Sequence, residues 1–224
     1  MLNAKGSNTF IKVCGITCVE DAEFVSSQAV DAIGLVFYDK SPRAVSPEQA
    51  KTICDCVPSN IRKVGLFVNA EKDRIEAVLK EVPLDVLQFH GKESAEFCEV
   101  FDLPYWKAIQ VREDTDLKKE MDDYSKAEYV LLDAWHPDLY GGTGQRFDWD
   151  LLDEGNDSAK DNTRNGAINR QRIILAGGLA PGNVAEAIRT VHPFGVDVST
   201  GVESSPGRKS AQLVEQFVNE VKRV

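Results

Sequence analysis

The feature that most constrains the fold of this chain is a regular alternation between short apolar runs and segments with helical spacing. Each run has the length and the apolar or β-branched composition of a buried strand. Eight such runs occur along the 224 residues, at 10–15, 32–37, 63–68, 85–89, 105–111, 129–133, 172–176 and 195–198. Because strands that alternate with helices pair in parallel, the pattern predicts an α/β protein.

Segments with helical patterns separate most of these strands. They are expected at 19–29, 46–53, 94–101, 116–125 and 181–188, with another helix ending at Val82 and a last amphipathic one at 209–221. Eight strands favour a closed (β/α)8 TIM barrel over an open doubly wound sheet. An open sheet usually has an early G-x-G-x-x-G turn, and this sequence has none after the first strand. We therefore expect a single barrel domain over residues 1–224, since barrels of this length fold around one core.

One segment interrupts the alternation. Residues 154–171 are polar, rich in Asn and Asp, and have no apolar periodicity. Such a composition is typical of a mobile surface excursion rather than of a core element. We expect it to precede the seventh strand and to have no role in chemistry.

The net charge and the cysteine pattern narrow the possible partners. The formal charge is −10 and the Lys and Arg residues form no block, which argues against nucleic acid but leaves room for a phosphorylated small molecule. No apolar run approaches the roughly 18 residues of a membrane span, and the first residues contain no secretion signal, so a cytoplasmic location is expected. The five cysteines lack paired C-x-x-C spacing, so neither disulfides nor a metal site is expected.

Two predicted strand-to-helix turns near the end of the chain are rich in small residues. Gly177 and Gly178 follow the seventh strand, and Ser199, Thr200 and Gly201 follow the eighth. Hydroxyls and the backbone N–H groups that glycine leaves open can replace water around a phosphate. Glycine after a strand is also ordinary turn chemistry, but two such turns in succession favour a phosphate site, and barrels commonly hold one there.

Two residues at predicted carboxyl ends of strands could transfer protons, and barrel enzymes place their chemistry at these ends. Cys14 ends the first strand and could act as a base if nearby positive charge stabilises its thiolate. It could also be a small buried hydrophobic residue. Asp133 ends the sixth strand and could donate a proton if partial burial raises its pKa, or it could cap a helix or a loop.

Two more residues lie near the same strand ends. His90 follows the fourth strand and is more often a hydrogen-bonded structural residue than a catalyst, so we assign it a supporting role. Asp197 lies in the eighth strand. Lys12 has the same strand parity as Cys14 and should point inward one layer below it, where it needs a carboxylate partner such as Asp197. The two charges could also merely neutralise each other inside the barrel.

Further candidates lie in loops. Arg43, in the loop after the second strand, could be a solvated charge, but its fork of donors opposite the phosphate end would suit a second anionic group such as a carboxylate. Gly142, Thr143 and Gly144 belong to a glycine-rich loop after the sixth strand that could wrap a substrate and donate hydrogen bonds to it. One Gly-Gly-Thr-Gly run alone is a weak indication.

A series of motifs runs along almost the whole chain: KVCGIT (12–17), GLVFYDKSPRAVSP (34–47), VGLFVN (64–69), LQFHG (87–91), LLDAW and GGTGQRFDW (131–149), LAGGLAPGNV (175–184) and GVDVSTGVE (195–203). Taken together and in this order, they resemble the phosphoribosylanthranilate isomerase family of tryptophan biosynthesis. The combination is far more specific than any one motif. The segment 154–171 departs from the resemblance, because it is longer than the family's usual connection.

The resemblance implies a cofactor-free Amadori rearrangement of N-(5-phosphoribosyl)anthranilate to 1-(2-carboxyphenylamino)-1-deoxyribulose 5-phosphate. Cys14 matches the general base of the family and Asp133 its general acid. Arg43 matches the residue that holds the anthranilate carboxylate, and the two glycine turns match the phosphate site. These roles are expectations that the resemblance supplies.

Other functions use similar folds. The related isomerase of an aminoaldose in the histidine pathway uses two carboxylates, and the thiol at position 14 argues against it. A sugar-phosphate epimerase needs paired carboxylates and usually a metal. An inactive phosphometabolite-binding barrel is disfavoured because both proton-transfer candidates are present. The sequence leaves open whether the protein is a monomer or a homodimer.

Overall fold

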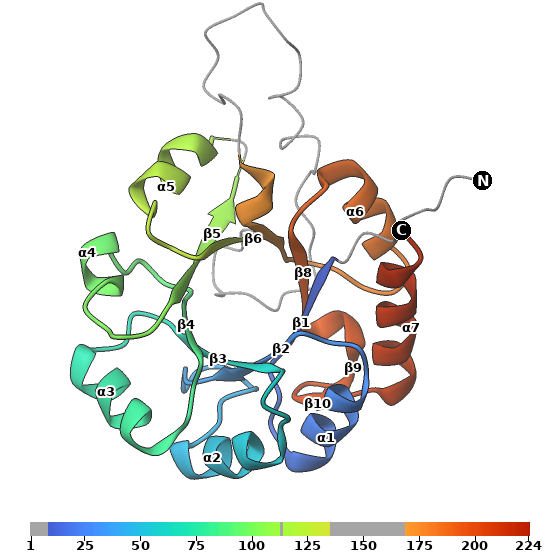
Figure 1. Ribbon diagram of the computed structural model, residues 1–224, viewed down its shortest axis with the longest axis horizontal. Coiled ribbons are helices and arrows are strands. Elements are labelled where there is room, and N and C mark those ends of the chain that lie inside the picture. The colour runs from blue at the N-terminus through green and yellow to red at the C-terminus, as the bar shows by residue number, and fades with distance from the viewer. Residues whose placement is uncertain (1–8, 113, 135–168) are drawn as a thin grey trace, which may run out of the picture.

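The computed structural model describes residues 9–112, 114–134 and 169–224. Within them, eight parallel strands close into a barrel in which each strand pairs with the next along the chain and β8 pairs with β1 (Figure 1). The predicted (β/α)8 barrel is thereby confirmed. The strands are β1 (Phe10–Cys14), β2 (Ala32–Val36), β3 (Arg62–Phe67), β4 (Val86–Phe89), β5 (Tyr105–Val111), β6 (Tyr129–Ala134), β7 (Ile173–Leu175) and β8 (Gly195–Val198).

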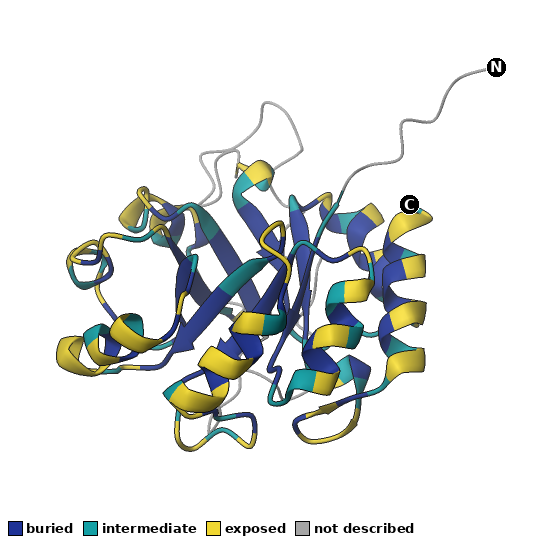
Figure 2. Cartoon of the chain, turned by 60° about the horizontal axis from the view of Figure 1, so that its bottom comes forward, coloured by how far each residue is buried: buried dark blue, intermediate teal, exposed yellow. Residues whose placement is uncertain are grey.

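Helices form a ring around the strands and turn their buried sides toward them (Figure 2). They are α1 (Val19–Ser27), α2 (Pro47–Cys56), α3 (Lys72–Glu81), α4 (Ala95–Cys98), α5 (Leu117–Asp123), α6 (Val184–Val191) and α7 (Ala211–Lys222), with 3-10 turns η2 (Arg170–Arg172) and η3 (Thr200–Val202). The start of α2 shows how the sequence determines where a helix begins. The Ser46 hydroxyl accepts the backbone N–H of Gln49, and the Gln49 side chain accepts the backbone N–H of Ser46.

Every predicted strand begins and ends within one residue of an observed strand. The chain after β8 differs from the prediction. The expected helix at 209–221 begins only at Ala211, because the preceding residues form an antiparallel hairpin of β9 (Glu203–Ser205) and β10 (Arg208–Lys209). The turn of this hairpin uses Gly207, whose φ is +79°. The predicted helix at 94–101 is also shorter, since α4 ends at Cys98.

Of the polar segment 154–171, residues 154–168 lie outside the described part of the chain. Its expected character as a mobile surface excursion therefore stays a prediction. The extent of the single domain over residues 1–224 stays a prediction for the same reason.

Side chains fill the barrel in layers from the N-terminal to the C-terminal ends of the strands. Aromatic rings of Phe10, Trp106, Tyr129 and Phe194 pack against one another at the N-terminal end, where the centroids of Tyr129 and Phe194 are 4.3 Å apart. Lys12 of β1 and Asp197 of β8 follow farther along the strands. Apolar packing therefore closes one end of the barrel and leaves the other for polar groups.

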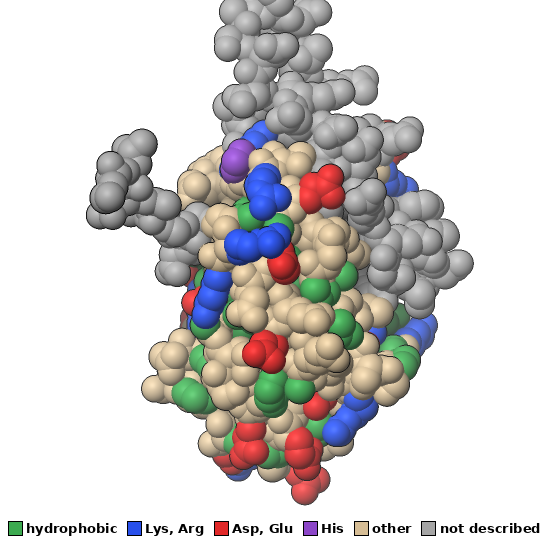
Figure 3. All heavy atoms as spheres, turned by 90° about the vertical axis from the view of Figure 1, so that its right-hand side faces the viewer, with side chains coloured by type: hydrophobic (Ala, Val, Ile, Leu, Met, Phe, Trp, Pro, Cys, Tyr) green, Lys and Arg blue, Asp and Glu red, His purple; other side chains and the backbone are tan. Residues whose placement is uncertain are grey.

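No helix in the described part of the chain is both long enough and apolar enough to cross a membrane. On the side of the molecule that carries α6 and α7, acidic and basic side chains both lie among uncharged ones (Figure 3).

Candidate active site

A cavity lies at the C-terminal ends of the strands. Its lining includes every predicted site residue that the structure describes: Cys14, Arg43, His90, Asp133, Gly177, Gly178, Asp197, Ser199, Thr200 and Gly201. Gly142, Thr143 and Gly144 lie outside the described residues, so their role stays a prediction. The fold thus brings together groups that are up to 187 positions apart, from Cys14 to Gly201.

Cys14 ends β1 and belongs to a buried polar group inside the barrel. Lys12 lies one layer below it, and its Nζ atom is 3.0 Å from Oδ1 of Asp197 in β8, which confirms the pairing predicted from strand parity. Gly34 in β2 provides the space, because a Cβ there would lie 2.6 Å from Sγ of Cys14 and 3.1 Å from Nζ of Lys12. The thiol and the ammonium group therefore share one small volume beside the cavity.

The charges in this group act on the thiol. Burial raises the pKa of Cys14, and the positive charge of Lys12 partly offsets that rise. Burial alone would lower the pKa of Lys12, but the Asp197 carboxylate and a Cys14 thiolate outweigh it, so the pKa of Lys12 is raised. Lys12 therefore stays charged and favours the thiolate form of its neighbour.

Asp133, at the C-terminal end of β6, is held by a histidine. Nε2 of His90 lies 3.1 Å from Oδ2 of Asp133, and the Gln88 amide nitrogen lies 3.1 Å from Nδ1 of His90. Because the amide nitrogen can only donate, Nδ1 accepts and Nε2 carries the hydrogen that points to Asp133. Gln88 was not among the predicted residues, although it lies two positions before His90 and therefore on the same strand face.

The two glycine turns touch each other. Gly177 and Gly178 have φ values of +77° and +66°, which favour glycine. Asn183 donates to the Gly178 carbonyl at 2.9 Å and so fixes the first turn. In the second turn, a Cβ on Gly201 would lie 1.9 Å from the Leu179 carbonyl oxygen, so only glycine permits this approach. The turns after β7 and β8 consequently form one continuous wall of the cavity.

Arg43 reaches from the loop after β2 to the loop after β8. Its guanidinium donates to both carboxylate oxygens of Glu203, at 2.8 and 2.7 Å, and its Nη2 atom also lies 3.2 Å from Oγ1 of Thr200. Gly15 makes room for this path, since a Cβ there would be 2.5 Å from Cδ of Arg43. Arg43 therefore lines the cavity beside the second turn, and its expected role in binding a second anionic group stays a prediction.

Sequence reasoning gave no role to Glu203 or Lys209, which the β9–β10 hairpin brings to the site. Nζ of Lys209 lies 2.8 Å from Oε1 of Glu203. Burial would raise the pKa of Glu203, but Arg43 and Lys209 outweigh it and the pKa is lowered. Burial lowers the pKa of Lys209, although Glu203 opposes that effect. The Pro-Gly pair in the segment between the two residues is a turn signal that could have indicated the hairpin.

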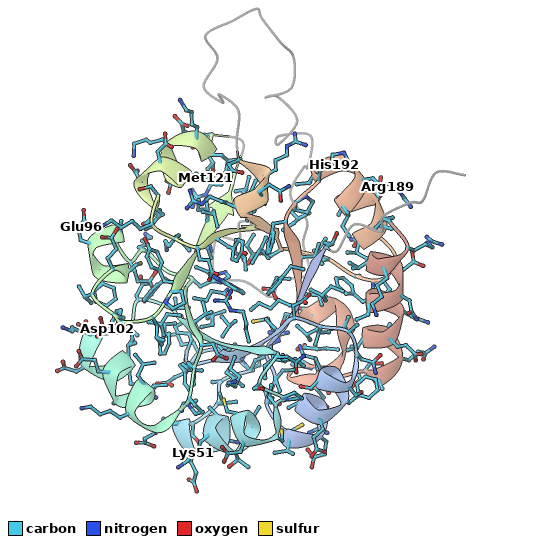
Figure 4. The ribbon with its side chains drawn as sticks, in the orientation of Figure 1. Lys51, Glu96, Asp102, Met121, Arg189 and His192 are labelled. Atoms are coloured by element: carbon cyan, nitrogen blue, oxygen red, sulfur yellow. The ribbon has the colours of Figure 1, made fainter. Side chains whose placement is uncertain are left out.

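Some charged side chains on the outer helices point away from this site. Lys51 of α2, Glu96 of α4 and Arg189 of α6 lie at the periphery and point away from the barrel, whose centre is filled with side chains (Figure 4). Among the described residues, no three His, Cys, Asp or Glu side chains gather in a way that could hold a metal ion.

The chain is similar to known proteins over nearly its full length. The family model of N-(5'-phosphoribosyl)anthranilate (PRA) isomerase matches residues 11–220. The protein named N-(5'-phosphoribosyl)anthranilate isomerase from Hahella chejuensis is 45% identical over 222 residues, which cover 99% of this chain and 98% of that one. The protein of the same name from Azotobacter vinelandii is 46% identical over 211 residues, covering 94% and 96%.

Two solved structures are similar as well. The phosphoribosylanthranilate isomerase of Thermotoga maritima has a TM-score of 0.82 and 36% identity, with 96% of this chain and 100% of that chain covered. A phosphoribosylanthranilate isomerase in complex with reduced 1-(o-carboxyphenylamino)-1-deoxyribulose 5-phosphate has a TM-score of 0.80 and 35% identity, with the same coverage.

Proposed function

The chain belongs to the N-(5'-phosphoribosyl)anthranilate isomerase family, and from that premise we propose how its residues carry out the reaction. It is an aldose–ketose isomerase of tryptophan biosynthesis. The reaction converts N-(5'-phosphoribosyl)anthranilate into 1-(o-carboxyphenylamino)-1-deoxyribulose 5-phosphate. One observation supports the assignment of roles above all: Cys14 and Asp133 line the same cavity as the two glycine turns.

The order of strands in the barrel supports a placement of the substrate. β7 and β8, whose turns are proposed to bind the phosphate, lie between β6 and β1. A sugar whose phosphate rests on these turns therefore has Asp133 of β6 on one side and Cys14 of β1 on the other. The backbone N–H groups of the turns, with Ser199 and Thr200, are proposed to replace the water around the phosphate.

Asp133 is proposed as the general acid. It protonates the ring oxygen of the ribose, the bond between that oxygen and C1 breaks, and the anilino nitrogen forms a protonated Schiff base with C1. The proton transfer leaves a carboxylate on Asp133. The N–H of His90, 3.1 Å away, then stabilises this carboxylate.

Cys14 is proposed as the general base. Its thiolate removes the proton from C2, and the electron pair of that C–H bond moves toward the nitrogen to give an enolamine. The enolamine tautomerises when C1 gains a proton and the C2 hydroxyl loses one, which produces the ketone. Substrate and product are isomers, so the proton that Cys14 takes from C2 balances the one that Asp133 gives to the ring oxygen. Proton exchange with water returns both side chains to their starting states, and the proposal needs no cofactor.

The test is turnover by the purified protein. With the substrate generated in situ, anthranilate fluorescence should decay when the protein is added. Addition of Cys14→Ala at the same concentration should slow the catalysed decay by about 10²–10⁴-fold. A wild-type protein that binds the reduced product analogue without any turnover contradicts the proposed chemistry.

A further inference from the structure

Three charged side chains form a compact cluster beside the cavity. The cluster consists of Arg43, Glu203 and Lys209, and we call it the hairpin cluster because β9 and β10 supply two of its members. Their side chains are only 10%, 3% and 1% exposed. Burial of three charges is costly unless they are well paired. The proposed acid–base steps use none of the three, and the proposed anion-binding role involves only Arg43.

The geometry of the cluster fixes the plane of the guanidinium. Nε and Nη2 of Arg43 donate to the two carboxylate oxygens of Glu203, a two-point contact that leaves little rotational freedom. The second hydrogen of Nη2 is directed to Thr200. Among the described residues, the side-chain hydrogen bonds of Arg43 use Nε and Nη2, and the residue lines the cavity.

Glu203 is itself held in place. Nζ of Lys209 donates to Glu203 and lies 3.3 Å from the Ser199 carbonyl oxygen. The backbone N–H of Lys209 donates to Asp21 at 2.8 Å, and the Thr17 hydroxyl donates to the Gly207 carbonyl. These bonds attach the hairpin to the loop and helix that follow β1, so Glu203 is presented to Arg43 from a rigid support.

The charges of the cluster matter as much as its geometry. An arginine paired with one glutamate is neutral as a pair and attracts an anion weakly. Lys209 is a second cation on the same glutamate, so the three groups together keep one positive charge. In a buried site this charge acts over a short distance with little screening.

We propose that Glu203 and Lys209 determine the specificity of the site: Glu203 fixes the Arg43 guanidinium so that Nη1 receives the carboxylate on the substrate's aromatic ring, and Lys209 preserves the positive charge that this carboxylate needs. The proposal rests on the proposed function. Glu203 and Lys209 are positioning residues in it, because they act through Arg43.

The experiment measures dissociation constants by calorimetry for three compounds: the reduced product analogue, the same compound without its carboxylate, and the same compound without its phosphate. The dissociation constant of each truncated compound, divided by that of the complete analogue, gives the contribution of the missing anion. The decisive variant is Glu203→Gln combined with Lys209→Met, because it keeps the net charge of the cluster while it releases Arg43. We expect the carboxylate contribution to fall by about tenfold or more, and the phosphate contribution to stay within about twofold.

The outcomes separate the possible roles. An unchanged carboxylate contribution overturns the proposal, and a fall in the phosphate contribution instead shows that Arg43 serves the phosphate. Arg208→Gln is the matched control, since Arg208 lies exposed on the same hairpin, and it should change neither ratio. An equal loss in that control means that the hairpin acts only as a whole, which also overturns the proposal.

Glu203→Gln alone is a second test, measured in the same binding experiment, that does not depend on the double variant. It adds one positive charge to the cluster. If charge alone governed recognition, the carboxylate contribution would rise, whereas loss of orientation makes it fall. Wild-type turnover is measured separately, so a protein that binds the analogue without turnover refutes the proposed function and leaves this binding test intact.

Discussion

At the N-terminal end of the barrel, polar groups are paired with one another beside aromatic rings, whereas at the C-terminal end they surround a cavity. The N-terminal end contains Arg62, whose guanidinium lies 5.5 Å above the centre of the Trp106 ring. Glu128 accepts hydrogen bonds from Arg62 at 2.9 and 2.8 Å and from the indole N–H of Trp106 at 3.0 Å. These groups satisfy one another within the protein.

The C-terminal end pairs its charges too, but three of these groups keep at least one member beside the open space. Asp197 of the Lys12–Asp197 pair, Arg43 of the hairpin cluster and both His90 and Asp133 line the cavity. The residues between them are small, because Gly177, Gly178 and Gly201 leave backbone groups accessible. Pairing therefore stabilises the fold at one end and prepares groups for a ligand at the other. Substitutions at the two ends should therefore separate folding from function.

The largest expected effect at the C-terminal end comes from Asp133→Asn. A general acid typically contributes about 10²–10⁴-fold, so kcat should fall by that factor. The amide keeps the shape of the side chain, so the reduced product analogue should bind with an affinity close to that of the wild type. Steady-state kinetics and calorimetry measure the two quantities. A kcat within threefold of the wild type assigns the acid to another residue.

A pH effect should follow from the charges around Cys14. Only the thiolate can accept the C2 proton, and burial raises the pKa of this thiol, so kcat/KM should increase with pH through the neutral range. Lys12→Met combined with Asp197→Asn removes the Lys12 charge, which lowers the pKa of Cys14, together with the smaller opposing effect of Asp197. It leaves no lone buried carboxylate. In this double variant, the acid limb of kcat/KM should therefore move to higher pH.

The control for this pH effect is Lys119→Met, since Lys119 is an exposed cation on α5. Its profile of kcat/KM against pH should overlay that of the wild type. The double variant at positions 12 and 197 could instead show the same profile as the wild type. In that case the acid limb of kcat/KM belongs to a group other than Cys14.

A moderate effect on binding is expected from Gly178→Ala. Gly178 has a φ of +66°, a conformation that costs alanine about 1–2 kcal/mol, and the methyl group would stand beside the proposed phosphate site. KM should rise by about tenfold while kcat changes little, because the acid and the base lie elsewhere.

Gly182→Ala is the matched control on the same connection. A Cβ at Gly182 meets no atom within 4 Å, so this variant should keep the KM of the wild type. If both alanine variants raise KM equally, or if Gly178→Ala lowers only kcat, the turn after β7 does not hold the phosphate.

The smallest expected effect on activity comes from the N-terminal end. Trp106→Phe removes the indole donor to Glu128 and leaves space in a fully buried layer, which should lower the free energy of unfolding by about 1–3 kcal/mol. The folded variant should keep its kcat and KM. Denaturant unfolding and steady-state kinetics check both, and a large loss of kcat at unchanged stability would contradict the division between the two ends.

The barrel could be predicted from the sequence because each strand depends on local patterns. The runs at 105–111 and 195–198 match β5 and β8 without any shift, and strand parity predicts that Lys12 points into the barrel, where it pairs with the suggested partner Asp197. These features need only the period of the strand and the parallel pairing of neighbours.

The contacts of the site between distant segments could not be predicted in the same way. Arg43 and Glu203 are 160 positions apart, and nothing local in either segment indicates that they meet. Their contact depends on the path of two loops over Gly15 and on the hairpin after β8. Gln88 could have been predicted to face the barrel interior, because it has the same strand parity as His90. However, glutamine at a buried strand position does not by itself indicate a chemical role.

The most direct test of this account is the turnover number of Cys14→Ala, measured together with its affinity for the reduced product analogue. If Cys14 is the general base, kcat should fall by about 10²–10⁴-fold while the dissociation constant stays close to that of the wild type, since the proposed anchors for phosphate and carboxylate are intact. A near-wild-type kcat would show that the thiol is only a packing residue and that another base, such as Asp197, removes the proton.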